Sequence, residues 1–123
     1  MIRLIFLLLA FCQAAAAQQL VSSYQGTLTL SAATSTTLIA ANVTMAPNSA
    51  TLPATFNGDT LTVINTVSVN TMYVCWGGGT ASATSGCEPI LPGAGDTVTL
   101  KGTGSPPSMF STSGTTVAFR QGQ

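Results

Sequence analysis

Two cysteines and the only tryptophan lie together in the segment CWGGGTASATSGC, from Cys75 to Cys87. Thiolates bind metals or act as nucleophiles, a Gly-rich run can cradle a phosphate, and an indole ring can stack on a sugar. Each of the first three chemistries needs partner residues. The sequence has no histidine, its third cysteine is the distant Cys12, and no lysine follows Gly77–Gly79. We therefore expect no metal, no nucleotide and no other cofactor.

A disulfide is the chemistry that best suits Cys75 and Cys87. Their bond would close a loop of about a dozen residues, which the chain-entropy estimate makes worth about 3 kcal/mol. Such a bond forms in an oxidising compartment. Two free thiols are the alternative interpretation.

Catalytic acids and bases are scarce. The carboxylates of a glycosidase must face each other across a cleft, and Glu88 with Asp96 is the pair to consider. Both flank turns, where acidic residues are common for backbone reasons, and Asp59 lies in a turn as well. No G-x-S-x-G motif presents a nucleophilic serine. The sequence predicts a protein that is not an enzyme.

Three aromatic residues, Trp76, Tyr73 and Tyr24, are the candidate ligand-binding residues. Exposed Trp and Tyr side chains stack on sugars or anchor protein partners, because they bring a large rigid area at small entropic cost. The alternative is that they fill the core, as a Trp beside a disulfide commonly does in a β-sandwich. Both roles stay open for all three residues.

The N-terminus has the pattern of a cleavable signal peptide over residues 1–17. Arg3 precedes an apolar run over residues 4–11, and alanines at 15–17 form an A-x-A cleavage site. An uncleaved anchor and a lipoprotein attached through Cys12 are the alternatives, but the run is shorter than the roughly 20 residues that span a membrane. We expect an exported protein, periplasmic or extracellular, without a stable membrane anchor after cleavage.

The remaining residues, 18–123, have the length of one domain. They carry two basic residues, Lys101 and Arg120, and three acidic ones, a net charge of −1. Two isolated cations do not provide the basic patch that nucleic-acid binding needs. With 46% hydrophobic residues the chain is not disordered either.

Short alternating runs at intervals of about ten residues predict seven to nine β-strands and no long helix. This spacing is typical of an all-β fold, here a single antiparallel β-sandwich. Residues 61–76 are expected to form a hairpin that turns at Asn70, and residues 109–119 a second hairpin that turns at Ser113 and Gly114. The clearest runs lie at residues 21–30, 36–45, 61–65, 72–76, 96–100, 109–110 and 117–119.

The second half of the chain also resembles small accessory structural proteins of tailed bacteriophages, of the decoration or head-fibre type. The matching elements are Tyr73–Gly78 (YVCWGG), Pro89–Gly93 (PILPG), Thr97–Leu100 (TVTL) and Gly114–Val117 (GTTV). The resemblance implies a β-sandwich with an assembly role and no catalytic residues. The expected signal peptide and the cysteine pair depart from that pattern. They point to a secreted bacterial relative or a prophage-derived gene.

These observations together predict an exported, non-enzymatic structural or binding module. Its expected partner is a protein assembly or a surface glycan, and self-association stays open. The alternative function is a carbohydrate- or ligand-binding module that uses Trp76.

Overall fold

The computed structural model describes residues 23–56, 58–67, 69–100 and 104–121. The predicted signal peptide and Cys12 lie outside these residues. Within them the chain forms β-strands and one short 3-10 helix, η1. The elements are β1 (Gln25–Leu30), β2 (Thr36–Thr37), η1 (Ala40–Asn42), β3 (Val43–Met45), β4 (Thr60–Asn65), β5 (Met72–Cys75), β6 (Glu88–Ile90), β7 (Gly95–Thr99), β8 (Ser108–Phe110) and β9 (Thr115–Gln121).

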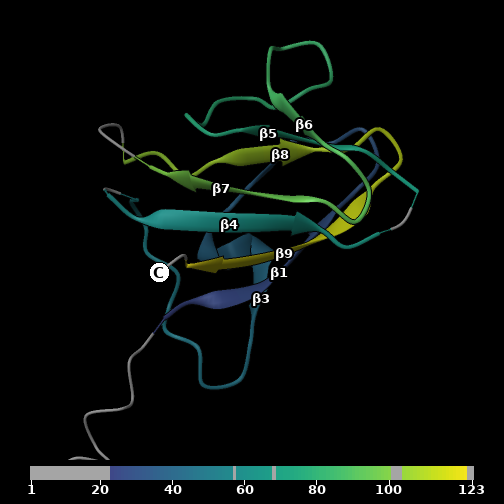
Figure 1. Ribbon diagram of the computed structural model, residues 1–123. Helices are drawn as coiled ribbons and strands as arrows, with labels where there is room; N and C mark the ends of the chain where they lie inside the picture. The colour runs from purple at the N-terminus through teal and green to yellow at the C-terminus, as the bar shows by residue number, and fades with distance from the viewer. Residues whose placement is uncertain (1–22, 57, 68, 101–103, 122–123) are drawn as a thin grey trace, which may run out of the picture.

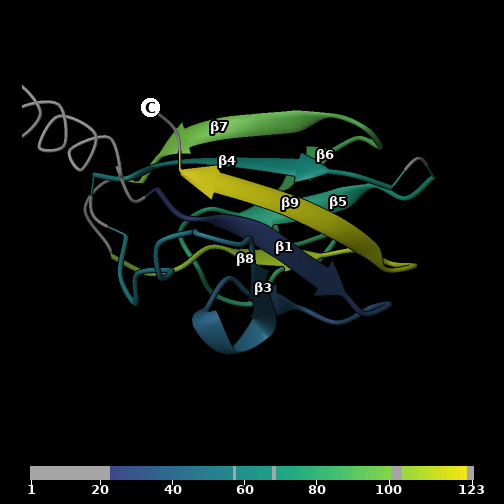
Figure 2. The ribbon, with the colours of Figure 1, turned by 90° about the horizontal axis from the view of Figure 1, so that it is seen from below.

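The strands form two antiparallel sheets, which Figure 1 shows stacked on each other. The larger sheet has the order β3-β1-β9-β4-β7, and the smaller has the order β2-β8-β5-β6. Figure 2, seen from below, shows the larger sheet with β9 between β1 and β4. The predicted all-β class is confirmed, and two stacked antiparallel sheets are consistent with the predicted sandwich.

The apolar positions of the strands meet between the two sheets. Leu28 and Leu30 of β1 are buried on one side while the alternating Thr27 and Thr29 are exposed, as the two-residue repeat of a strand predicts. Leu61, Val63 and Asn65 of β4 are also buried on one face of their strand. Burying each large apolar side chain contributes roughly 1.5–3 kcal/mol. Other members of this core are Met72, Val74, Ile90, Met109, Val117 and Phe119.

Threonines occupy many outward positions of the larger sheet. The hydroxyls of Thr62 and Thr97 are 2.7 Å apart across β4 and β7, and those of Thr60 and Thr99 are 3.1 Å apart. Such cross-strand pairs stabilise a sheet by a few tenths of a kcal/mol to about 1 kcal/mol each. Hydroxyl groups therefore give this face its polarity, in a chain with few charges.

Both predicted hairpins are wrong. β4 belongs to the larger sheet and β5 to the smaller one, so the chain passes from one sheet to the other between Asn65 and Met72. β8 and β9 are separated in the same way, and residues 111–114 connect them. The alternation of side chains shows which face of a strand is buried, but a strand can meet that requirement in either sheet. The partners of β9 are instead β1 and β4, from much earlier in the chain.

Four connections gather at one end of the two sheets, which we call the loop end. They are residues 31–35, the described residues of 66–71, and residues 91–94 and 111–114, and they lie at the right of Figure 1. The pairing of Leu30 with Thr115 and of Ile64 with Gly95 brings them together from distant parts of the sequence. Loops that a rigid scaffold presents together are common places for binding sites.

Candidate functional site

Tyr24, the first of the three aromatic candidates, lies in the core. Its side chain is only 4% exposed, and its ring meets that of Phe56 edge to face at 5.9 Å. Burial, and secondly the nearby negative charge of Asp59, raise the pKa of Tyr24 to about 12. Of the two roles that the sequence allows for this residue, the structure therefore gives it the core role.

Trp76 is half-buried beside the disulfide. Cys75 and Cys87 are bonded, which links the end of β5 to the residue before β6. The indole Nε1 of Trp76 donates a hydrogen bond of 2.6 Å to Glu88 Oε2, and its ring packs against the core. The indole N–H therefore already has a partner within the protein. Its hydrogen bond links the end of β5 to β6, the same two strands that the disulfide joins.

Tyr73 faces outward from the smaller sheet and is half-buried. It lies opposite Phe110 of β8, with ring centroids 6.5 Å apart and ring planes tilted by 51°. On its other side it lies opposite the exposed Pro89 of β6. The structure does not gather the three candidates into one site, and only Tyr73 lies next to the loop end.

The side chain of Asn65 holds the loop end together. This residue is fully buried, and its side-chain amide makes three of the four hydrogen bonds open to it. Asn65 Nδ2 donates to the carbonyl oxygens of Asn70 at 2.6 Å and Ile90 at 3.2 Å. Asn65 Oδ1 accepts a bond of 2.7 Å from Thr115 Oγ1. One amide thus connects β4 to three other segments, and a fully satisfied buried network of this kind is rigid.

Further hydrogen bonds fix the same loops. The backbone N–H of Asn65 donates to Ala94 O, and Gly93 N–H donates to Asn65 O, both at 2.9 Å. Asn70 Nδ2 donates to Gly114 O at 2.7 Å, which joins the 66–71 and 111–114 connections. The loop end is therefore a set of well-anchored turns on the two sheets.

A polar pocket of about 220 Å³ opens at the loop end. Its walls come from the 66–71 and 111–114 connections and from the first part of β5. Six of its seven lining residues have a hydroxyl or amide side chain, and none is charged. The lining residues are Val69, Asn70, Thr71, Tyr73, Ser111, Thr112 and Ser113.

The most exposed large apolar side chains of the described residues also lie on the loop end. Val69 is 75% exposed and Leu91 is 63% exposed, whereas Ile39, at 38%, lies away from these loops beside η1. Leu91 directly follows Ile90, whose carbonyl is held by Asn65, and Val69 precedes Asn70, which is held in the same way. Apolar side chains exposed on loops that a rigid scaffold holds in place are available to contact a partner.

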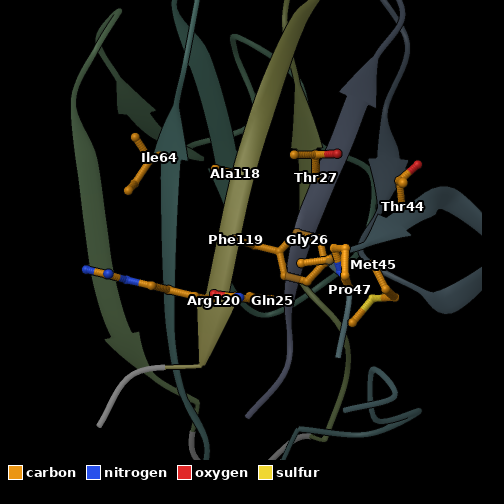
Figure 3. Close-up of a pocket in the computed structure, with 11 residues that line it drawn as sticks. Gln25, Gly26, Thr27, Thr44, Met45, Pro47, Ile64, Ala118, Phe119 and Arg120 are labelled. Carbon is orange, nitrogen blue, oxygen red and sulfur yellow. The ribbon is translucent and has the colours of Figure 1, made fainter. Parts of the chain in front are cut away.

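A wider groove of about 390 Å³ lies on the larger sheet, across β3, β1, β9 and β4 (Figure 3). The hollow forms because Gly26 and Ala118, which line it, have little or no side chain. Arg120 extends from β9 over β4, while Thr27 and Thr44 stand on the opposite side. The groove offers one cation and no convergent set of polar groups, so it is a weaker candidate than the loop end.

Gly26 in this groove has no room for a side chain. A Cβ atom there would contact the carbonyl oxygen of Thr44 and would come within 2.9 Å of Phe119 Cζ. We expect Gly26→Ala to lower the free energy of unfolding by about 1–3 kcal/mol through overpacking. Gly77→Ala is the matched control, since nothing lies within 4 Å of its Cβ position. Equal urea midpoints for the two variants would show that β1 and β3 do not approach as described.

Sequence reasoning missed most of the loop end. The spacing of Asn65 from Leu61 and Val63 puts it on the same face of the strand, and a polar residue at such a buried position was the available signal for a structural hydrogen-bond network. Thr112 and Ser113 gave no signal, since they look like any turn residues. Among the described residues no group of three His, Cys, Asp or Glu side chains is placed to hold a metal ion.

No helix in the described part of the chain is long and apolar enough to cross a membrane. Comparison with known proteins adds no relative: no family model, no curated protein and no solved structure matches this chain. The loop end is therefore interpreted from its own geometry and chemistry.

Proposed function

We propose that this protein is an exported, non-enzymatic β-sandwich that acts as a binding module through its loop end. In this proposal it is an accessory part of a larger assembly outside the cytoplasm, as the resemblance to phage accessory domains implies. The observation that carries the proposal is the anchoring of three connections, 66–71, 91–94 and 111–114, by Asn65 and Asn70, with Val69 and Leu91 exposed on two of them.

Anchored loops support a binding role for a physical reason. A binding surface that is already ordered loses little conformational entropy when the partner arrives, so more of the contact energy appears as affinity. The bonds from Asn65 and Asn70 supply that order before any partner is present. Ordinary surface loops need no such buried network.

Export is supported by the Cys75–Cys87 disulfide, which suits an oxidising compartment. It agrees with the signal peptide expected over residues 1–17. The two features are independent, since one lies in the folded domain and the other before it.

Binding to the surface of the producing cell tests the proposal. The mature chain, residues 18–123, is labelled and titrated onto envelope fragments of the organism that encodes it. We expect saturable binding that falls about tenfold, equivalent to about 1.4 kcal/mol, in the double variant Val69→Ser and Leu91→Ser. The reason is that these two side chains are the exposed apolar groups of the loop end.

Ile39→Ser is the matched control, because it removes an exposed apolar side chain of similar size from outside the loop end. The control should bind like the original chain. Absence of saturable binding, or equal loss in both variants, would reject the loop end as the contact surface.

A further inference from the structure

The pocket at the loop end has the chemistry of a neutral-sugar site. We propose that it binds one ring of an uncharged saccharide, with Tyr73 as the ring that contacts the sugar face. This inference rests on the proposed binding role of the loop end and names its ligand class. It places the sugar at Tyr73, away from Trp76.

The pocket excludes charged ligands by its composition. The charged residues in the described part of the chain are Asp59, Glu88, Asp96 and Arg120, and none of them lines the pocket. An anionic ligand such as a phosphate or an acidic sugar would find no cation, and a metal ion would find no carboxylate. A neutral polar ligand matches the site best.

The pocket offers many hydrogen-bonding groups that the protein does not use. The side-chain hydroxyls of Thr71, Tyr73, Thr112 and Ser113 make no hydrogen bond to any described residue. Hydroxyls both donate and accept, as the hydroxyls of a sugar do, so such groups pair in either direction. Asn70 donates to Gly114 through Nδ2, which fixes its side chain and leaves Oδ1 as an acceptor.

Ser111 is the residue that distinguishes this pocket from an ordinary polar hollow. It lines the pocket and is fully buried, and its Oγ has no hydrogen-bond partner among the described residues. A buried hydroxyl without a partner is costly, and native proteins keep few of them. Because Ser111 Oγ has almost no accessible surface, a ligand hydroxyl reaches it only after a small shift of the pocket wall, and the hydrogen bond formed there would remove that cost in the complex.

The shape of the pocket also fits a sugar ring. Tyr73 is half-buried and held at an angle by Phe110, so its ring is positioned in advance. The exposed side chain of Val69 borders the pocket, whose exposed lining is mostly polar, so hydrogen bonds would provide most of the contact with the sugar. At about 220 Å³ the pocket is smaller than the roughly 300–1,000 Å³ pockets of drug-sized ligands. It therefore has room for a single ring of a longer chain.

Titration of the folded mature chain with neutral monosaccharides and short neutral oligosaccharides, followed by amide NMR, tests this proposal. We expect shifts at the amides of residues 69–73 and 111–113 with at least one of these sugars. Thr112→Ala and Tyr73→Phe should each weaken binding about three- to tenfold, the effect of one lost hydrogen bond. Thr29→Ala removes an exposed threonine hydroxyl from the outer face of β1 and should leave affinity unchanged.

Ser111→Ala separates binding from folding. Because its hydroxyl has no partner in the free protein, we expect this variant to unfold at the same or a higher denaturant concentration while it binds the sugar more weakly. A merely structural role for Ser111 would lower stability and leave affinity unchanged.

Three results would overturn the sugar site. They are an absence of shifts with every neutral saccharide at millimolar concentration, shifts centred on Trp76 and Glu88, and binding of acidic sugars alone. If envelope binding still depends on Val69 and Leu91 when no sugar binds, only the ligand class is wrong. If envelope binding is absent as well, the proposed function fails with it.

Discussion

Asn65→Ala should lower the free energy of unfolding by about 3–5 kcal/mol, because each buried polar group left without a partner costs about 1–3 kcal/mol. The substitution leaves the carbonyl oxygens of Asn70 and Ile90 and the hydroxyl of Thr115 without the Asn65 amide. Equilibrium unfolding in urea measures the change as a lower midpoint at an unchanged slope. Amide exchange at Gly93 should also become faster, because the loss of the side-chain bonds loosens the loop end in which Gly93 N–H is bonded to the backbone oxygen of residue 65.

Asn42→Ala is the matched control for this variant. Asn42 also uses its amide group, since Nδ2 donates to Thr37 O at 2.8 Å, but the bond is exposed to solvent. Its loss should cost less than about 1 kcal/mol, because water replaces the partner. Similar costs for Asn42→Ala and Asn65→Ala would mean that Asn65 does not organise the loop end.

Replacing both Cys75 and Cys87 with serine should lower the free energy of unfolding by about 3 kcal/mol. The disulfide closes a loop with a sequence separation of 12 residues, so its loss allows the unfolded chain many more conformations. Unfolding of the original chain with and without reductant should show the same difference. The double variant, in contrast, should not respond to reductant.

An unchanged midpoint on reduction would contradict this expectation. So would alkylation of both cysteines, without reductant, in the folded protein. Either result would favour the two free thiols that the sequence leaves as the alternative.

Local patterns predicted which side chains are buried but not which strands are paired. The alternation of Leu28 and Leu30 with threonines gave the inner face of β1 correctly, because that face depends only on the two-residue repeat of a strand. The pairing of β4 with β9, in which Val63 lies opposite Phe119, joins residues far apart in the sequence. Neighbouring strands therefore looked like hairpins although the chain passes from one sheet to the other.

Because local patterns do not show which distant segments meet, the sequence did not reveal the pocket at the loop end. Trp76 and Tyr24 were prominent as residue types, and the structure gives the first a bond to Glu88 and the second a place in the core. The pocket at the loop end exists only because two crossing connections meet, so no continuous segment of sequence contains it. Of the predicted candidates, Tyr73 alone lines it, and its ligand-binding role stays a prediction.

The position of β9 has a consequence for how the protein is made. β9 lies between β1 and β4, and it follows every other strand in the chain. A nascent chain that has not reached Thr115 therefore leaves β1 and β4 without the strand that joins them, and its larger sheet cannot close. We therefore expect the larger sheet to form only after synthesis has passed Thr115, which would keep its strands unpaired long enough for the proposed export.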